Sequence, residues 1–535
     1  MKKTILLSTC IVAAICLLRC NNTTTTTTTS SSTTTEASSS TGNFNPVPFP
    51  DTLKIPGFTF PTDSTVIDGW LTLENTDSVK AVDSIYYHGW GIWAGLTTPT
   101  SQKDSFGAPI LVFETWDTPG LLQEELQNEK AGVANAVITR KHRAALRFPD
   151  QFKHSGKNNA ARTMLLSNNA GKAACNQPQY SKGTYPLYVA VAYDIPAASH
   201  ILNHKLYDTS VLNHILASGV DTIPDFPVNS IALKPTYEVI PKAVMEAGNA
   251  PFRIPNGPNN SCELGYGQSQ WPCLVYIDWT NNKANIGNSG MDCDSTGPGK
   301  NPKAIYNLNQ FIYYRLTAEE ADSIQQEGDA ASAGDYVILV AMHVTTKETK
   351  RWTWQSFFWI PNVATPPGPS DPYIPTMRPP QMTGAPAHYA MAIGYTFTWP
   401  NQPYTGGNEK GYIIYSYNPF LEAGFGSAAS NSPANPTPMT NNGTVIDPKT
   451  KVATINKVGG QTNCMSCHAL ATYTSSEPLI LNNPNTNGQT QTYYADTYID
   501  MLTNPNFNDP HSKYNNRKKL QLDFLWSIDN SIIGK

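Results

Sequence analysis

The sequence is poor in charge. Only 15% of its 535 residues are Asp, Glu, Lys or Arg, and the formal net charge is -4. No extended run of Lys or Arg occurs, so the chain lacks the basic surface on which nucleic-acid binding depends. We therefore expect no nucleic-acid partner.

Long apolar stretches are also scarce. After Lys2 and Lys3, residues 5–18 are apolar but too few for a membrane span, which needs roughly 20 residues. A positive start followed by a short apolar run is typical of a secretory signal, here 1–20. Cys20 follows that run, which predicts a lipid-attachment cysteine and anchoring to a membrane. Leu17-Leu18-Arg19 are not the small residues usual before such a cysteine, and an ordinary secretory signal is the alternative.

Residues 21–43 contain almost no apolar side chains. They are nearly all Thr and Ser, so they cannot bury enough surface to fold. We expect a disordered tether that holds a soluble body at a periplasmic or outer-membrane surface of the bacterial cell envelope.

The rest of the chain is rich in turn residues and Tyr, with 42 Pro, 36 Gly and 26 Tyr. This composition favours short strands over long helices. We predict a mixed, mainly β fold: a β-rich α+β body at 44–430 and a small, partly helical segment at 431–535. Strands are expected at 108–113, 187–193, 230–234, 274–279, 335–343, 352–359 and 411–417. Helices are expected at 123–131, 197–206, 208–217, 321–326 after a capping box at 317–320, and 517–528.

One motif carries recognisable chemistry, Cys464-Met465-Ser466-Cys467-His468. Two thiols three positions apart can each bond one vinyl group of a haem, and the adjacent imidazole then binds the iron as the proximal ligand. The motif therefore predicts one covalent haem c held by Cys464, Cys467 and His468. Covalent attachment of this kind takes place outside the bacterial inner membrane, in agreement with export.

Two other interpretations of the cysteine pair are weaker. A thioredoxin-type disulfide begins a helix after a strand, whereas the residues before Cys464 form a polar loop that contains Gly459 and Gly460. Half of a zinc site would need a second pair of cysteines or histidines, and the sequence contains no second close-spaced pair of cysteines.

The sixth iron position is left open by the sequence. Met391, Met439 and Met501 are candidate distal ligands, with His388 and His511 as further options. A Met ligand raises the reduction potential, a His lowers it, and an open position permits small-molecule chemistry.

Three other groups of residues have both a structural and a functional interpretation. His200 and His204 are spaced to face one metal, but two histidines without a metal are favoured. The aromatic residues of 352–359 suit a haem-contact or sugar-stacking surface, but a strand buried on both faces is favoured. In an exported chain the four remaining cysteines suggest two disulfides of undetermined pairing, with at least one bridge among the last three: Cys175, Cys262, Cys273 and Cys293.

The chain resembles a group of bacterial proteins known as cytochrome c family proteins, in residues 334–346, 352–359, 415–420 and 463–468. The resemblance implies haem binding and electron transfer, with a redox partner that it does not name. The chain is unlike small class I cytochromes, in which a helix runs into the motif. Here a large β-rich body and a glycine-containing loop precede the motif, so we expect the haem to pack against that body. The alternatives are a haem enzyme, peroxidase- or oxidase-like with an open sixth site, and a surface binding protein with a sensor or structural haem.

Overall fold

The computed structural model describes one compact unit within Thr41–Lys535. The described residues are 44–73, 76–133, 143, 145–147, 183–255, 271–282, 290–293, 304–396, 398–399, 412–414, 416–422, 444–446, 453–455, 464–468, 471–473, 520–529 and 531–533. They form a mixture of helices and mainly antiparallel sheets, which confirms the mixed α and β fold. The predicted boundary at residue 430 lies outside the described residues.

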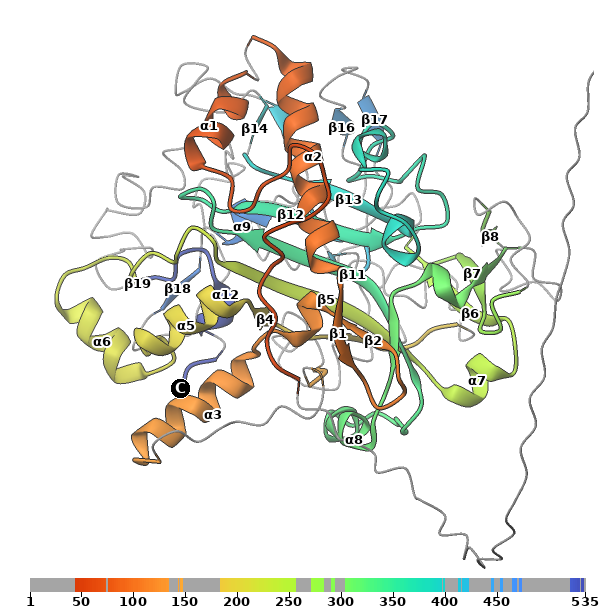
Figure 1. Ribbon diagram of the computed structural model, residues 1–535, viewed down its shortest axis with the longest axis horizontal. Coiled ribbons are helices and arrows are strands. Elements are labelled where there is room, and N and C mark those ends of the chain that lie inside the picture. Colours follow the sequence, from red (N-terminus) through yellow and green to blue (C-terminus); the bar gives the residue numbers. More distant parts are fainter. Residues whose placement is uncertain are drawn as a thin grey trace, which may run out of the picture. The chain divides into compact units, whose positions relative to one another are not determined.

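The largest sheet contains the strands that the apolar pattern predicts best. Its order is β13-β12-β11-β5-β3, with β10 paired to β11 and β4 to β5, and every pairing is antiparallel. Figure 1 labels strands β4, β5, β11, β12 and β13 of this sheet. The central strands are almost wholly buried, because both faces of the sheet are covered. The bounds are β3 Leu187–Val189, β4 Ala192–Tyr193, β5 Ile231–Ile240, β10 Tyr313–Arg315, β11 Tyr336–Thr346, β12 Thr353–Trp359 and β13 Tyr389–Ile393.

The two faces of this sheet have different neighbours. Phe357 pairs with Met391 across β12 and β13 and stacks on Trp93 of helix α2, Ser78–Leu96, with ring centroids 4.4 Å apart. Trp354 is three residues before Phe357, an odd number, so its side chain lies on the opposite face. That second face is covered by a separate apolar cluster, which we call the second core and which includes Phe226, Trp352, Met465 and Leu522.

Helices agree with the sequence where capping signals are strong. Helix α8, Ala318–Gln326, begins at the capping box formed by Thr317 and Glu320. The prediction of one helix at 517–528 is wrong, because strand β19 and a turn precede a short helix, α12. The helices are α1 Ser64–Leu73, α2, α3 Pro119–Lys130, α5 Ile195–Asn203, α6 Thr209–Ala217, α7 Lys242–Glu246, α8, α9 Cys464–His468 and α12 Trp526–Asp529.

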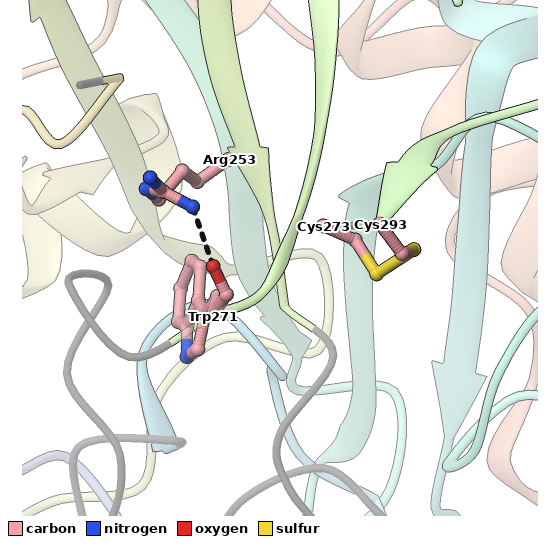
Figure 2. The surroundings of a disulfide bond; sticks show 4 residues. All are labelled: Arg253, Trp271, Cys273 and Cys293. Atoms are coloured by element: carbon pink, nitrogen blue, oxygen red, sulfur yellow. Dashed lines mark hydrogen bonds between the residues drawn. A yellow bond between two sulfur atoms is a disulfide. The ribbon is translucent and has the colours of Figure 1, made fainter. Parts of the chain in front are cut away.

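A second sheet contains a disulfide. Cys273 of β7 bonds Cys293 of β8, which confirms the expected bridge in this region, and Cys175 and Cys262 lie outside the described residues. Figure 2 shows the bridge near Arg253, whose buried guanidinium donates to the carbonyl of Trp271 at 2.6 Å. The strands are β6 Ala250–Ile254, β7 Cys273–Asp278, β8 Asp292–Cys293 and β9 Ile305–Asn307, the last parallel to β7.

The remaining strands form two-stranded ribbons. They are β1 Pro99–Lys103 with β2 Pro109–Leu111, β14 Thr398–Trp399 with β15 Tyr412–Ile413, β16 Thr444–Ile446 with β17 Ala453–Ile455, and β18 Thr472–Tyr473 with β19 Leu520–Gln521. Among the residues just described, no helix combines the length and the apolar character needed to cross a bilayer.

Candidate haem-attachment site

The motif forms the short helix α9 and is anchored at its first residue. The backbone N–H and the thiol of Cys464 each donate to the carbonyl of Ser416 at 3.0 Å. Met465 is fully buried in the second core. The helical backbone brings positions 464, 467 and 468 to one side, because residues three and four apart in a helix are neighbours. The side chain of Cys467 lies outside the described part.

The imidazole of His468 is oriented by a backbone carbonyl. Its Nδ1 lies 2.7 Å from the oxygen of Phe524, in the turn after β19. A carbonyl only accepts, so Nδ1 carries the proton and Nε2 keeps its lone pair. Within the described part of the chain Nε2 makes no hydrogen bond. A histidine that ligates a metal through one nitrogen typically donates from the other in this way.

The surroundings of His468 keep it neutral. The pKa of His468 is lowered to about 3, mainly by burial and also by the nearby charges of His343 and Lys234, while the hydrogen bond to Phe524 acts in the opposite direction. The indole of Trp354 lies against the imidazole, with ring centroids 4.4 Å apart. A neutral imidazole is the form that binds iron, so the electrostatics of the site suit a ligand.

The turn that supplies the carbonyl is tied to the sheet. Asp523 precedes Phe524, and its carboxylate accepts from Lys347 Nζ at 2.6 Å and from Trp352 Nε1 at 3.2 Å. Lys347 and Trp352 belong to the hairpin between β11 and β12. The support of His468 therefore comes from segments far from the motif in sequence.

An ionisable pair lies on the same sheet face as Trp354. His343 pairs with Ser356, two residues along β12 from Trp354, and its Nε2 lies 3.1 Å from Glu422 Oε1. The segment that carries Glu422 also carries Ser416, the partner of Cys464. No sequence pattern indicates His343 or Glu422, because they are far apart in the chain and become neighbours only in the folded structure.

The structure separates one candidate distal ligand from His468. The sulfur of Met391 packs on Gly89 of α2, where a Cβ would lie only 2.6 Å from it. Met391 thus faces α2, on the opposite side of the sheet from Trp354 and His468. His388 lies beside Arg378, ahead of β13, and burial lowers the pKa of His388. Met439, Met501, His511 and the lipid-attachment candidate Cys20 lie outside the described residues.

The other predicted groups are placed as follows. Strand β12 is buried on both faces, as favoured from the sequence, while its Trp354 also contacts His468. The Nε2 atom of His200 lies 3.0 Å from the carbonyl oxygen of Pro224, and His204 is exposed.

Among the described residues, no three His, Cys, Asp or Glu side chains come together as a metal-ion site. A haem needs no such group, since its ring supplies four of the iron ligands.

Comparison with known proteins adds no assignment: no family model matches the chain, and neither the curated proteins nor the solved structures include a significant match. The resemblance to cytochrome c family proteins stays a prediction.

Proposed function

We propose that the chain is a mono-haem c-type cytochrome that transfers electrons in the bacterial cell envelope. The observation that carries the proposal is the hydrogen bond from His468 Nδ1 to the Phe524 carbonyl. It leaves a neutral imidazole whose Nε2 makes no hydrogen bond to another described residue, beside the two-cysteine motif, and this is the donor set that a haem c requires.

Haem bound at this motif supplies an iron that changes between the ferric and ferrous states. Cys464 and Cys467 hold the macrocycle by thioether bonds, and His468 is the proximal ligand. Trp354 shields the imidazole from water, while the Phe524 carbonyl fixes its orientation. The protein thus sets the solvent access and the ligand basicity, two properties that tune a haem potential.

The proposal includes the setting of the haem. The segment 431–535 is a partly helical haem segment packed on the β-rich body, and α9 and α12 are its described helices. The disulfide between Cys273 and Cys293 supports an oxidising compartment. Cys20 carries the lipid and residues 21–43 form the tether. The redox partner is a protein or small electron carrier of the same compartment.

Covalent haem is tested by exporting the full chain from a host with a haem c maturation system. We expect haem that stays on the chain in denaturing electrophoresis and that is lost in the C464S/C467S variant. The matched control is Met391→Leu. It removes a sulfur-containing side chain from the α2 face, and we expect this variant to keep the haem. A wild-type chain without covalent haem rules out the proposed function.

A haem oxidoreductase with an open sixth position is the second candidate. The His343–Glu422 pair favours it, because such acid–base pairs serve proton transfer during small-molecule chemistry. A high-spin ferric spectrum that changes on adding cyanide supports the enzyme. A low-spin spectrum with the weak red band of a Met ligand supports electron transfer alone.

A further inference from the structure

The carbonyl that orients His468 belongs to an unusual stretch of backbone. Asp523 and Phe524 are consecutive non-glycine residues with φ of 45° and 68°. Side chains in this left-handed region crowd the backbone carbonyl, so the conformation is costly in free energy. It persists only where the surrounding structure holds it in place, and such sites concentrate near functional groups.

The side chain of Asp523 provides that hold. Its Oδ1 accepts from Lys347 and Trp352, and its Oδ2 accepts from the backbone N–H of Phe226 at 3.2 Å. The side chains of Lys347 and Asp523 are only 6% and 5% exposed, so solvent screens their ion pair weakly. Three donors from two parts of the chain therefore fix the carboxylate.

The backbone closes the other side of the turn. Leu522 N donates to the Ala471 carbonyl at 2.9 Å, and Ala471 N donates to the His468 carbonyl at 3.0 Å. The turn at Asp523 and Phe524 is therefore fastened to the end of the motif on one side. On the other side it is fastened to the hairpin between β11 and β12.

We propose that Asp523 is a positioning residue for the haem site: it holds the Phe524 carbonyl where that oxygen fixes His468 in its Nδ1–H form. The hydrogen bond also increases the donor strength of Nε2 toward iron. The statement about iron rests on the proposed function, whereas the statement about the tautomer holds for the chain without haem.

The tautomer is tested on the full chain produced without haem maturation. Solid-state NMR of protein with ¹⁵N-labelled histidine separates Nδ1–H from Nε2–H, and the variant His468→Gln assigns the signal among the 10 histidines. We expect Nδ1–H in the wild type and a shift toward Nε2–H in Asp523→Ala and Asp523→Asn. The matched control is Asp225→Asn, which removes a 77% exposed carboxylate 3.6 Å from the same lysine and leaves the tautomer unchanged.

The loaded protein gives a second readout, the midpoint potential. Loss of the hydrogen bond weakens the donation from Nε2 to the iron. The equilibrium then shifts toward the ferrous state by up to about tenfold, which raises the midpoint potential by up to about 59 mV for one electron. The ferric g values in electron paramagnetic resonance shift with it. Asp225→Asn leaves both unchanged.

Each outcome decides the proposal. Asp523 variants that fold and keep both the Nδ1–H signal and the midpoint potential overturn it, as does an equal shift in Asp225→Asn. If Asp523→Ala does not fold, the nearly isosteric Asp523→Asn decides. A wild type that takes up no haem defeats the proposed function, and the tautomer measurement then decides on Asp523 by itself.

Discussion

Strand β12 is buried on both faces, yet the two faces are built differently. Around Phe357 the α2 face is filled by close packing, with Trp93 stacked on the ring and Met391 against Gly89. On the face of Trp354 the neighbours are polar as well as apolar. They include His468 of the motif and the ion pair between Lys347 and Asp523.

The two faces also differ in the backbone conformation of the residues around them. Around the second face, three non-glycine residues adopt positive φ: Trp352, Asp523 and Phe524. Natural proteins break local rules of this kind mainly where function requires a particular geometry. One face of β12 therefore serves stability, and the other also fixes the orientation of the His468 imidazole.

The largest effect is expected from Trp354→Ala, because it acts on both stability and the site. Removing the buried indole costs about 3–5 kcal/mol of unfolding free energy. Because burial is the main cause of the low pKa of His468, that pKa rises toward its usual value of 6.5. In the haem-loaded protein of the proposed function, water would also reach the haem and lower the midpoint potential. Urea unfolding, a ¹⁵N histidine titration and a redox titration measure the three changes.

Phe357→Ala is the matched change on the α2 face. It also costs about 3–5 kcal/mol, since the ring is fully buried against Trp93. We expect the pKa of His468 and the midpoint potential to stay at their wild-type values. If they change as much as in Trp354→Ala, the two faces are not functionally distinct.

Gly89→Ala tests the tightness of the α2 face. A Cβ at this position lies 2.6 Å from the Met391 sulfur and 2.7 Å from Ile393 Cδ1, so both side chains must move. Overpacking of this kind costs about 1–3 kcal/mol, measured by thermal or urea unfolding. No loss of stability would show that the α2 face is loosely packed.

The last prediction is a dependence of stability on pH that originates at His468. Between pH 6.5 and about 3 the unfolded chain binds a proton at His468 that the folded chain does not. The stability of the haem-free protein is therefore complete above pH 6.5 and falls as the pH is lowered. The contribution of one proton is about 1.4 kcal/mol per pH unit. His468→Gln removes this part of the slope, whereas an unchanged slope contradicts the low pKa.

Much of the fold could be predicted, because apolar runs mark buried strands and capping residues mark helix ends. Strands β11 and β12 and helix α8 follow directly from such patterns. Helix α2 could not be recognised, because its glycines argue against a helix. Those glycines instead let aromatic rings pack against the helix backbone. A Cβ at Gly91 would clash with the ring of Phe58, and a Cβ at Gly95 would clash with the ring of Phe49.

The site could be predicted only as far as its motif. Cys464, Cys467 and His468 are adjacent in sequence, so their spacing is visible. Phe524 lies 56 residues from His468, and its role depends on a positive φ that no local pattern indicates. The prediction of a helix at 517–528 was wrong because this segment is also shaped by a distant part of the chain. Strand β19 pairs with β18, and the turn follows it.

The hydrogen bond from His468 to Phe524 also bears on the order of biogenesis. A chain that crosses a membrane from its N-terminus delivers the two thiols and the imidazole before the carbonyl that orients that imidazole, which arrives 56 residues later. Under the proposed function, haem attachment can thus take place on a partly translocated chain whose proximal side is still open. Folding of the later segment would then enclose the proposed cofactor, so maturation enzymes would have access for only a limited time.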